Sequence, residues 1–270
     1  MPEITIEPNA WDAKIAQYAS TRDPDALQAV PEPEWRDLSS DFANIRPTSV
    51  ERAEARFRRR IGEAIQGDAF LENITYTLPE IEDVLGGTHV PGHTEGEELQ
   101  VIDMKKAADS VLWRIRERPT QPSQELSDGL HMLIASNLNL ASLLFRGDQR
   151  ERYNGPFVRL GRGRKFQALD ARLTHDVLDA GLPRILSVEH PVVRGATWAA
   201  FAAYQQFYFD GNKRTGRYVM NTVAMSHGFD AIVIPTSARE QYVNEVVNAL
   251  ETGDLTSHIA FLLSLYDDGR

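Results

Sequence analysis

The sequence contains no cysteine, which excludes a disulfide framework, a thiolate metal site and a cysteine nucleophile. It also lacks any run of about 18 apolar residues, so no segment is expected to span a membrane. The first residues, MPEITIEPNAWDAK, have no basic region followed by an apolar run and therefore do not resemble a secretory signal peptide. These absences favour a cytoplasmic location.

Positive charge is in short supply. The 270 residues include 29 Lys and Arg against 39 Asp and Glu, which gives a net charge of -10. Such a balance disfavours nonspecific binding to nucleic acid or to an anionic membrane. With 42% hydrophobic and 25% charged residues, the composition is that of an ordinary globular protein. A chain of this length buries a large core without covalent cross-links.

Helical periodicity dominates the sequence from residue 48 onward. Thr48 and Glu51 have the spacing of a capping box, and apolar residues then recur at helical intervals as far as Ile65. A second capping box, Thr77 with Glu80, precedes a helix that should end at the glycines 86–87. Helices are expected over residues 48–65, 77–85, 99–115, 126–144, 169–180, 191–209, 212–227, 237–250 and 255–266.

A short β-hairpin is the exception to this helical pattern. Two short runs flank Gly161-Arg162-Gly163 within residues 157–168, as in a hairpin. The expected fold class is therefore all-α, a helical bundle with one β-hairpin. The arginines of residues 56–60 lie on the polar side of the first helix, and we expect them to face solvent.

Three regions are expected along the chain. Residues 1–47 are rich in proline and weakly periodic, which indicates an irregular N-terminal extension. Trp11, Trp35 and Phe42 indicate that this extension packs against the body of the protein. Residues 48–98 then form N-terminal helices, and residues 99–270 form the core.

The stretch from Tyr204 to Arg217, YQQFYFDGNKRTGR, has the residues of a phosphate site. Gly211 permits a tight turn, and the unpaired N–H groups of the helix that follows attract an anion. Arg214 and Arg217 share one face of that helix, so their guanidinium groups can grip two phosphates. Asp210 suits a Mg²⁺ ion held between carboxylate and phosphates. The simpler alternative is a helix that Asp210 caps, with two solvated arginines.

These residues resemble the Fic signature, His-Pro-Phe-x-Asp/Glu-Gly-Asn-Gly-Arg-x-x-Arg. The match runs through Asp210, Gly211, Asn212, Arg214 and Arg217. Further similarities extend the resemblance over roughly residues 100–265, and more loosely over 50–100: the Asn-Lys-Arg of the Doc branch at Lys213, Glu189-His190-Pro191, a strand and turn at 157–166, Gly228-Phe229 and Arg239-x-x-Tyr242.

The resemblance implies a Fic-type helical bundle that transfers AMP from ATP to a protein hydroxyl. It implies Mg²⁺ on Asp210, the α-phosphate on Asn212 and the turn amides, the β-phosphate on Arg214 and the γ-phosphate on Arg217. Tyr242 is either a core aromatic or a wall of the adenine pocket. The other implied site residues are Gly211, Lys213 and Gly216 around the nucleotide, and Val158, Arg159 and Leu160 in a flap that aligns the target by main-chain hydrogen bonds.

The sequence departs from the signature at its first position, where Gln206 stands in place of the histidine. In the family that imidazole is the usual general base, whereas a glutamine amide cannot take up a proton. Losing a general base typically costs about 10²–10⁴-fold in rate. Phe207 and Tyr208 also differ from the pattern, and a hydroxyl of Tyr204 or Tyr208 is a poor base at neutral pH.

An upstream segment resembles the inhibitory helix of one Fic class, Ser/Thr-x-x-x-Glu-Gly/Asn. Glu72 and Asn73 match it, and Asp68 stands in the Ser/Thr place, where it could cap a helix. The resemblance implies that Glu72 pairs with Arg217, takes the place of the γ-phosphate and keeps the protein autoinhibited. The alternative is that Glu72 is an exposed loop acid.

Three functions therefore stay open. The first is an autoinhibited protein adenylyltransferase that uses ATP and Mg²⁺. The second is a nucleotide-binding interaction module without transfer, which Gln206 favours. The third is a changed reaction, either Doc-like phosphotransfer or removal of AMP. The expected partners are ATP and a protein target docked by the flap, with no nucleic acid and no membrane, and a homo-oligomer stays possible.

Overall fold

The computed structural model describes residues 33–117, 119–137, 144–148, 156–161 and 163–266. Within these residues it is a helical bundle with one antiparallel hairpin, which confirms the predicted fold class. The elements are α2 (Val50–Arg59), α3 (Ile61–Leu71), α4 (Leu78–Leu85), α5 (Glu95–Arg114), α6 (Gln124–Ile134), η3 (Arg146–Asp148), β1 (Phe157–Gly161), β2 (Arg164–Gln167), η4 (Ala171–Leu173), α7 (Thr174–Leu186), α8 (Pro191–Gln205), α9 (Asn212–Ser226), η5 (Thr236–Ala238), α10 (Arg239–Thr252) and α11 (Thr256–Ser264).

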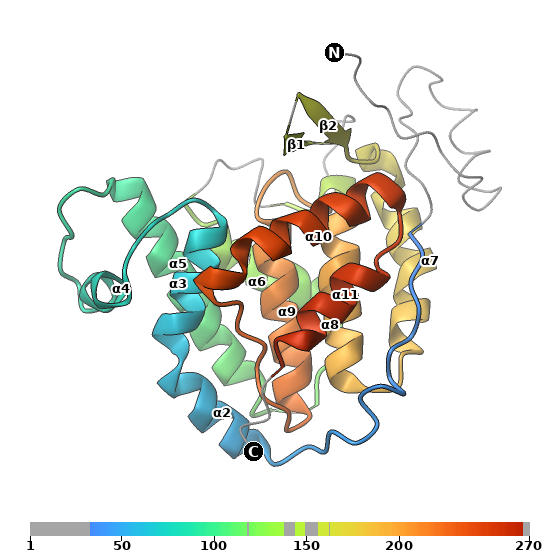
Figure 1. The fold of residues 1–270 in the computed structure, drawn as a ribbon, viewed down its shortest axis with the longest axis horizontal. Helices are drawn as coiled ribbons and strands as arrows, with labels where there is room; N and C mark the ends of the chain where they lie inside the picture. The colour runs from blue at the N-terminus through green and yellow to red at the C-terminus, as the bar shows by residue number, and fades with distance from the viewer. Residues whose placement is uncertain (1–32, 118, 138–143, 149–155, 162, 267–270) are drawn as a thin grey trace.

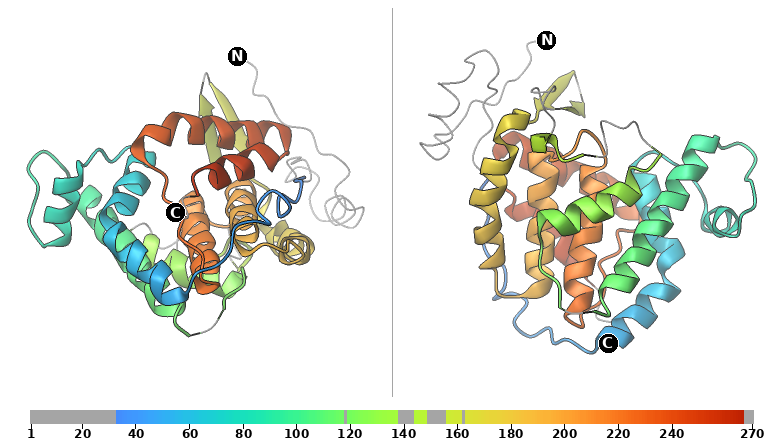
Figure 2. Two further views of the ribbon diagram at one scale, coloured as in Figure 1. Left: turned by 60° about the horizontal axis from the view of Figure 1, so that its bottom comes forward. Right: turned by 180° about the vertical axis from the view of Figure 1, so that it is seen from behind.

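Helices α8 and α9 form the centre of the bundle (Figure 1). Their backbones approach closely because glycines lie at the contact. A Cβ on Gly195 would lie 2.8 Å from the Met220 carbonyl oxygen, and one on Gly216 would lie 3.2 Å from Ala199 Cα. Helices α10 and α11 cover one side of this pair, and α5 and α6 cover the opposite side (Figure 2). Nearly every residue of α8 and α9 is consequently buried.

Two predicted helices differ most from the structure. The helix expected over 48–65 is two helices, because Arg60, at φ -109° and ψ 10°, interrupts it, and its N-cap is Ser49 rather than Thr48. The helix expected over 126–144 ends at Ile134. There the buried Asp103 carboxylate accepts hydrogen bonds from Ser136 Oγ (2.6 Å) and Asn137 Nδ2 (2.7 Å), which stabilise a turn. Periodicity does not detect this long-range contact.

Other local predictions are confirmed. Thr77 and Glu80 form a capping box with both hydrogen bonds present. The predicted hairpin pairs Val158 with Phe166. Helices α7 and α8 are present, but their ends differ from the prediction: α7 ends at Leu186 and not at residue 180, and α8 ends at Gln205 and not at residue 209.

The described part of the N-terminal extension packs on the body, as expected. The Trp35 ring lies edge-on to Phe201, with centroids 6.1 Å apart, and Phe42 lies edge-on to Tyr266 at 6.1 Å. Trp11 lies outside the described residues. The boundary expected at residue 98 lies within α5, so that helix belongs to both of the regions that the sequence suggested. Among the described residues, every helix is too short or too polar to cross a membrane.

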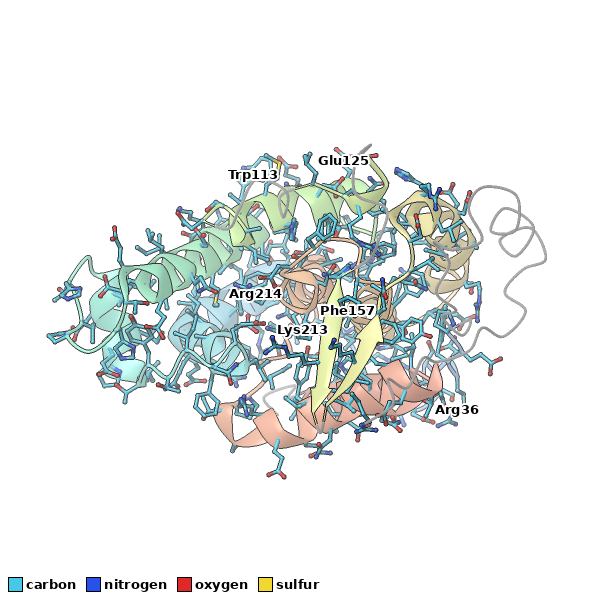
Figure 3. All side chains as sticks on the ribbon, turned by 90° about the horizontal axis from the view of Figure 1, so that it is seen from above. Arg36, Trp113, Glu125, Phe157, Lys213 and Arg214 are labelled. Carbon is cyan, nitrogen blue, oxygen red and sulfur yellow. The ribbon has the colours of Figure 1, made fainter. Side chains whose placement is uncertain are left out.

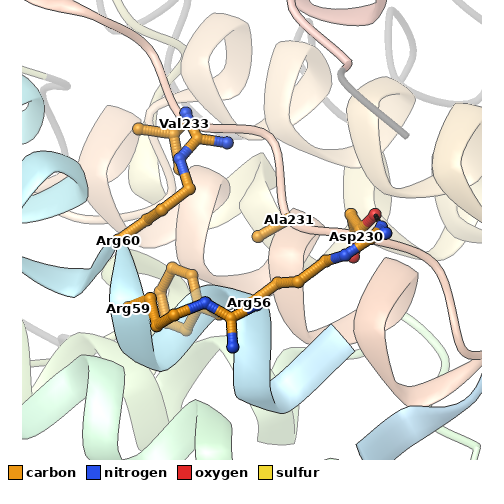
Figure 4. A pocket seen from close by; sticks show the side chains of 7 residues that line it. Arg56, Arg59, Arg60, Asp230, Ala231 and Val233 are labelled. Atoms are coloured by element: carbon orange, nitrogen blue, oxygen red, sulfur yellow. Dashed lines mark hydrogen bonds and ion pairs between the residues drawn. The ribbon is translucent and has the colours of Figure 1, made fainter. Parts of the chain in front are cut away.

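The basic face of α2 is less solvated than expected. The Arg56 guanidinium pairs with Asp230, and its side chain is only 19% exposed. Arg56, Arg59 and Arg60 line a cavity of about 160 Å³ together with Asp230 and Val233 (Figure 4). Arg59 is exposed, and Arg60 pairs with Glu63 on α3. This face therefore connects α2 to the segment that follows α9.

Candidate functional site

The chain reverses from α8 to α9 through a turn with two left-handed residues. Gln206 ends α8 with φ 53° and ψ 58°, and Gly211 precedes α9 with φ 77°. A Cβ on Gly211 would lie 3.1 Å from the His131 ring, so a side chain here would be both strained and crowded. Helix α9 has no side-chain cap, which leaves the N–H groups of its first turn open at the turn.

Arg146 holds this turn in place, and sequence reasoning missed it. The side chain is fully buried and donates to three carbonyls: Gln206 O at 2.5 Å, Leu169 O at 2.6 Å and Gln205 O at 3.2 Å. Burial lowers the pKa of Arg146 to about 10, so it stays charged at neutral pH. Its only sequence signal is an arginine within an apolar stretch.

The Gln206 side chain is turned into the loop. Its Oε1 accepts from Asn212 Nδ2 at 3.0 Å, and its Nε2 donates to the Ala203 carbonyl. Asn212 is similarly engaged, because its Oδ1 accepts from Tyr208 N at 2.7 Å and its Nδ2 also donates to Tyr208 O at 2.7 Å. The Asn212 side chain therefore shapes the turn, which leaves the backbone amides of α9 as the groups available to an α-phosphate.

Burial of both candidate tyrosines disfavours a role as a base. The Tyr208 ring stacks on His131 with centroids 3.6 Å apart, and its hydroxyl donates to Asp128 Oδ1 at 2.6 Å. Burial, with the Asp128 charge, raises the pKa of Tyr208 well above its usual value. Burial also raises the pKa of Tyr204.

Asp210 is the candidate ligand for Mg²⁺. Its side chain is 57% exposed at the turn, and its Oδ1 accepts from Gly211 N at 2.6 Å. The same oxygen lies 3.8 Å from Arg214 Nη2. No group of three or more His, Asp or Glu in the described ranges forms a complete metal site. One carboxylate with phosphate oxygens is nevertheless a common way to hold Mg²⁺, so Asp210 fits that ion as part of a nucleotide complex.

Arg214 and Arg217 are both buried, at 2% and 3% exposed. Arg214 Nη1 donates to Gln100 Oε1 at 3.1 Å, while its buried Nε makes no hydrogen bond. Arg217 Nη1 donates to the Tyr242 hydroxyl at 2.9 Å, while its buried Nη2 makes none. Buried donors are normally hydrogen-bonded, so these two mark places for acceptor atoms. The structure thus excludes the simpler alternative of two solvated arginines.

Two carboxylates approach these arginines, Asp68 in α3 and Glu72 at its C-cap, and their pairing corrects the expected one. Glu72 was expected to pair with Arg217, but its Oε1 lies 3.5 Å from Arg214 Nε. The partner of Arg217 is Asp68, whose Oδ1 accepts from Nε at 2.6 Å. Asp68 lies within α3 and does not cap it.

The arginine charges act on both carboxylates, but burial outweighs the charge of Arg217 at Asp68 and raises the pKa of that carboxyl. Burial alone would raise the pKa of Glu72, but the charges of Arg214, Lys213 and Arg217 outweigh burial and hold that pKa below its usual value. Burial alone would lower the pKa of Arg217, and Asp68 foremost reverses that shift. Glu72 is therefore ionised and faces the arginines, which excludes the alternative of an exposed loop acid; its side chain is 20% exposed.

Helix α3 packs closely over the site. A Cβ on Gly67 would lie 2.0 Å from the Ile234 carbonyl oxygen, so the helix packs against that backbone. At its end, Arg239 donates to Phe70 O at 3.1 Å and to Asn73 Oδ1 at 2.6 Å. Asn73 adopts the left-handed conformation, with φ 66°. These contacts fix where the carboxylates lie.

Tyr242 is a core residue. It is 2% exposed, and its ring lies 5.4 Å from the Arg217 guanidinium. Of its two predicted roles, the structure favours the core aromatic that supports Arg217.

Seen from above, the hairpin overlies the start of α9, where Lys213 and Arg214 are labelled (Figure 3). Among the three expected flap residues, Arg159 is exposed, Val158 is half-buried and Leu160 is buried. Arg164 pairs with Glu251 of α10, and Phe166 packs on Tyr204 with ring centroids 5.5 Å apart. Among the described residues this sheet has two strands only, so each strand has an outer edge without a neighbouring strand.

A helical bundle with a hairpin over an arginine-rich helix start defines a Fic-type fold, and known proteins share it. A Fic domain-containing signalling protein from Bacteroides thetaiotaomicron superposes with a TM-score of 0.65 at 15% identity, covering 84% of this chain and 88% of that one. Fic-1 from Caenorhabditis elegans (residues 134–508 of that protein) gives a TM-score of 0.61 at 19% identity, covering 93% and 72%.

Comparison of sequences also finds similarity to Fic proteins. The protein adenylyltransferase Fic of Drosophila grimshawi is 36% identical over 77 residues, which are 27% of this chain and 15% of that protein. The protein adenylyltransferase Fic of Drosophila willistoni is 25% identical over 269 residues, 96% of this chain and 50% of that protein. These matches thus span half or less of the relatives' length. No protein-family model matches the sequence. The fold is therefore that of Fic domains, and the sequence is similar to that of Fic adenylyltransferases over part of their length.

Proposed function

We propose that the chain binds ATP with Mg²⁺ at the start of α9 and transfers AMP to a hydroxyl side chain of a target protein. The observation that carries the binding step is the pair of buried guanidinium groups, each with an N–H group that makes no hydrogen bond, beside an uncapped helix start. The transfer step is supported by relatives named protein adenylyltransferase.

The residues divide the work by position. Asp210 would hold Mg²⁺, which would draw the phosphate oxygens together and reduce their negative charge. The α9 amides and Lys213 would bind the α-phosphate region, Arg214 the β-phosphate and Arg217 the γ-phosphate. The hairpin would align the target segment. Positioning and charge stabilisation supply much of the catalysis in such reactions, so some transfer persists without a base.

The same geometry supports the proposal that Glu72 inhibits nucleotide binding. Glu72 lies where it neutralises Arg214, and a carboxylate there competes with phosphate for the guanidinium. The Glu72→Gly protein should therefore label a target more strongly than the natural sequence does.

A labelled-ATP experiment tests this function. The protein with ATP labelled in the α-phosphate and a cell lysate should give protein-bound AMP, and Glu72→Gly should increase it. Arg214→Ala should abolish labelling, whereas Arg52→Ala, which changes an exposed arginine of α2, should not. The mass added to the target separates AMP from the phosphate of a Doc-like reaction, and loss of AMP from a labelled target would reveal the reverse activity.

A second candidate is a nucleotide-binding regulatory module without transfer. It is favoured because both polar ends of the Gln206 side chain bond within the turn and none faces a substrate. Gln206→His distinguishes the two candidates. If only the base is missing, labelling should increase by about 10²–10⁴-fold. ATP binding without labelling in both this variant and Glu72→Gly would favour the module.

A further inference from the structure

Two carboxylates, rather than one, oppose the phosphate-binding arginines. Asp68 and Glu72 are one helical turn apart at the C-terminal end of α3 and point to the same side. Each meets a different arginine: Asp68 meets Arg217 at 2.6 Å, and Glu72 meets Arg214 at 3.5 Å. The tighter contact is the one with Asp68.

We propose that Asp68 is an inhibitory residue in its own right, which occupies Arg217 while Glu72 occupies Arg214. This inference rests on the proposed function, because it assigns the regulation of the same nucleotide site. The chain therefore carries a double block, with one carboxylate for each phosphate-binding arginine.

The Asp68 contact is the shorter of the two and is enclosed, although burial itself opposes the Asp68 charge and raises the pKa of that carboxyl. The Asp68 side chain is 13% exposed and that of Arg217 is 4% exposed, so water screens their attraction little. Tyr218 and Tyr242 close the surroundings: burial and the Asp68 charge raise the pKa of Tyr218, and the Tyr242 hydroxyl accepts from Arg217. A phosphate that enters must displace Asp68 from this enclosed position.

The two carboxylates should discriminate between nucleotides. Arg214 lies in the first turn of α9 beside Asp210, whereas Arg217 lies one turn deeper. A diphosphate that starts at the turn reaches Arg214, and only a third phosphate reaches Arg217. Asp68 therefore weakens binding of ATP more than that of ADP, while Glu72 weakens both.

Calorimetry with Mg²⁺ tests this, using ATP, ADP, tripolyphosphate and pyrophosphate on the full chain. The variants are Asp68→Asn and Glu72→Gln, which remove charge but keep shape, and Asp68→Asn retains an oxygen that Arg217 can bond. Glu63→Gln is the matched control, because Glu63 is an acid of the same helix that pairs on the surface with Arg60. Thermal unfolding verifies that each variant folds.

We expect Asp68→Asn to increase the affinity for ATP and for tripolyphosphate by about tenfold or more, because the variant removes a charged group that competes for Arg217. The affinities for ADP and pyrophosphate should change little. Glu63→Gln should change nothing. If Asp68→Asn leaves ATP affinity unchanged while Glu72→Gln alone tightens it, the double block is wrong and the nucleotide site stands. If only the inorganic anions show the effect, the block stands and the nucleotide proposal is wrong. No anion binding in any variant overturns both.

Discussion

Arg146 gives the sharpest test of how the signature turn is held. Replacing it with methionine keeps much of the apolar stem and removes the three hydrogen bonds to Gln205, Gln206 and Leu169. The side chain is fully buried, so water cannot easily replace the lost donors. The carbonyls would then be left unsatisfied.

The expected cost follows from those three acceptors. A buried polar group without a partner costs about 1–3 kcal/mol. Removing the buried charge also removes its desolvation penalty, so the low end applies and the total is about 3 kcal/mol. For a protein of this size, 1 kcal/mol shifts Tm by about 2–4 °C, so Arg146→Met should lower Tm by about 6–12 °C.

Calorimetric unfolding of Arg146→Met measures this loss of Tm, with Arg194→Met as the control. Arg194 also donates to two backbone carbonyls, Val188 O at 2.8 Å and Glu189 O at 3.1 Å, but it is partly exposed, so water can take its place. Arg194→Met should therefore cost clearly less. Because Arg146 positions the turn without touching the ligand site, its loss should also weaken ATP binding. Equal Tm losses in the two variants would refute the reasoning.

Two further predictions concern stability. Gly67→Ala should destabilise the protein by about 1–3 kcal/mol in urea unfolding, because its Cβ would meet the Ile234 carbonyl, whereas Gly62→Ala, which meets only the end of a Leu side chain, should be neutral or stabilising. Arg116, with Arg58 in support, lowers the pKa of Glu54 to about 2, so this contact stabilises the fold above about pH 4.5 and is lost as the pH falls towards 2. Glu54→Gln should thus cost about 1–2 kcal/mol at pH 7, after allowing for solvent around the exposed Arg116, and almost nothing near pH 2; a cost independent of pH would contradict this.

Local signals predicted much of the fold. Capping residues and apolar periodicity are signals that lie within a few residues of one another. The Thr77 cap, the hairpin and the start of α9 were therefore all predictable. Helix ends that depend on distant contacts were not. The end of α6 depends on Asp103, some thirty residues upstream.

The residues of the candidate site also divide into those that local sequence signals predicted and those that depend on distant contacts. The signature predicted the turn and its two arginines, because glycine and charge at fixed spacing carry that information. Arg146 belongs to no such motif, because its partners are three backbone carbonyls, which every residue has. Its role could therefore not be predicted from the sequence. The engaged side chain of Gln206 also depends on tertiary structure, because it requires the left-handed end of α8.

The pairing of the carboxylates with the arginines shows why the sequence alone could not predict this part of the site. Asp68 precedes Glu72 on α3, yet it meets Arg217, the later arginine of α9, so the two helices run in opposite directions at this contact. The expected pairing of Glu72 with Arg217 needs α3 displaced by about one turn, or about 5.4 Å, along the same line. No residue in either motif decides between these registers. Contacts outside both motifs accompany the observed register: Gly67 packs against the Ile234 backbone, and Arg239 donates to Phe70 O and Asn73 Oδ1 at the end of α3.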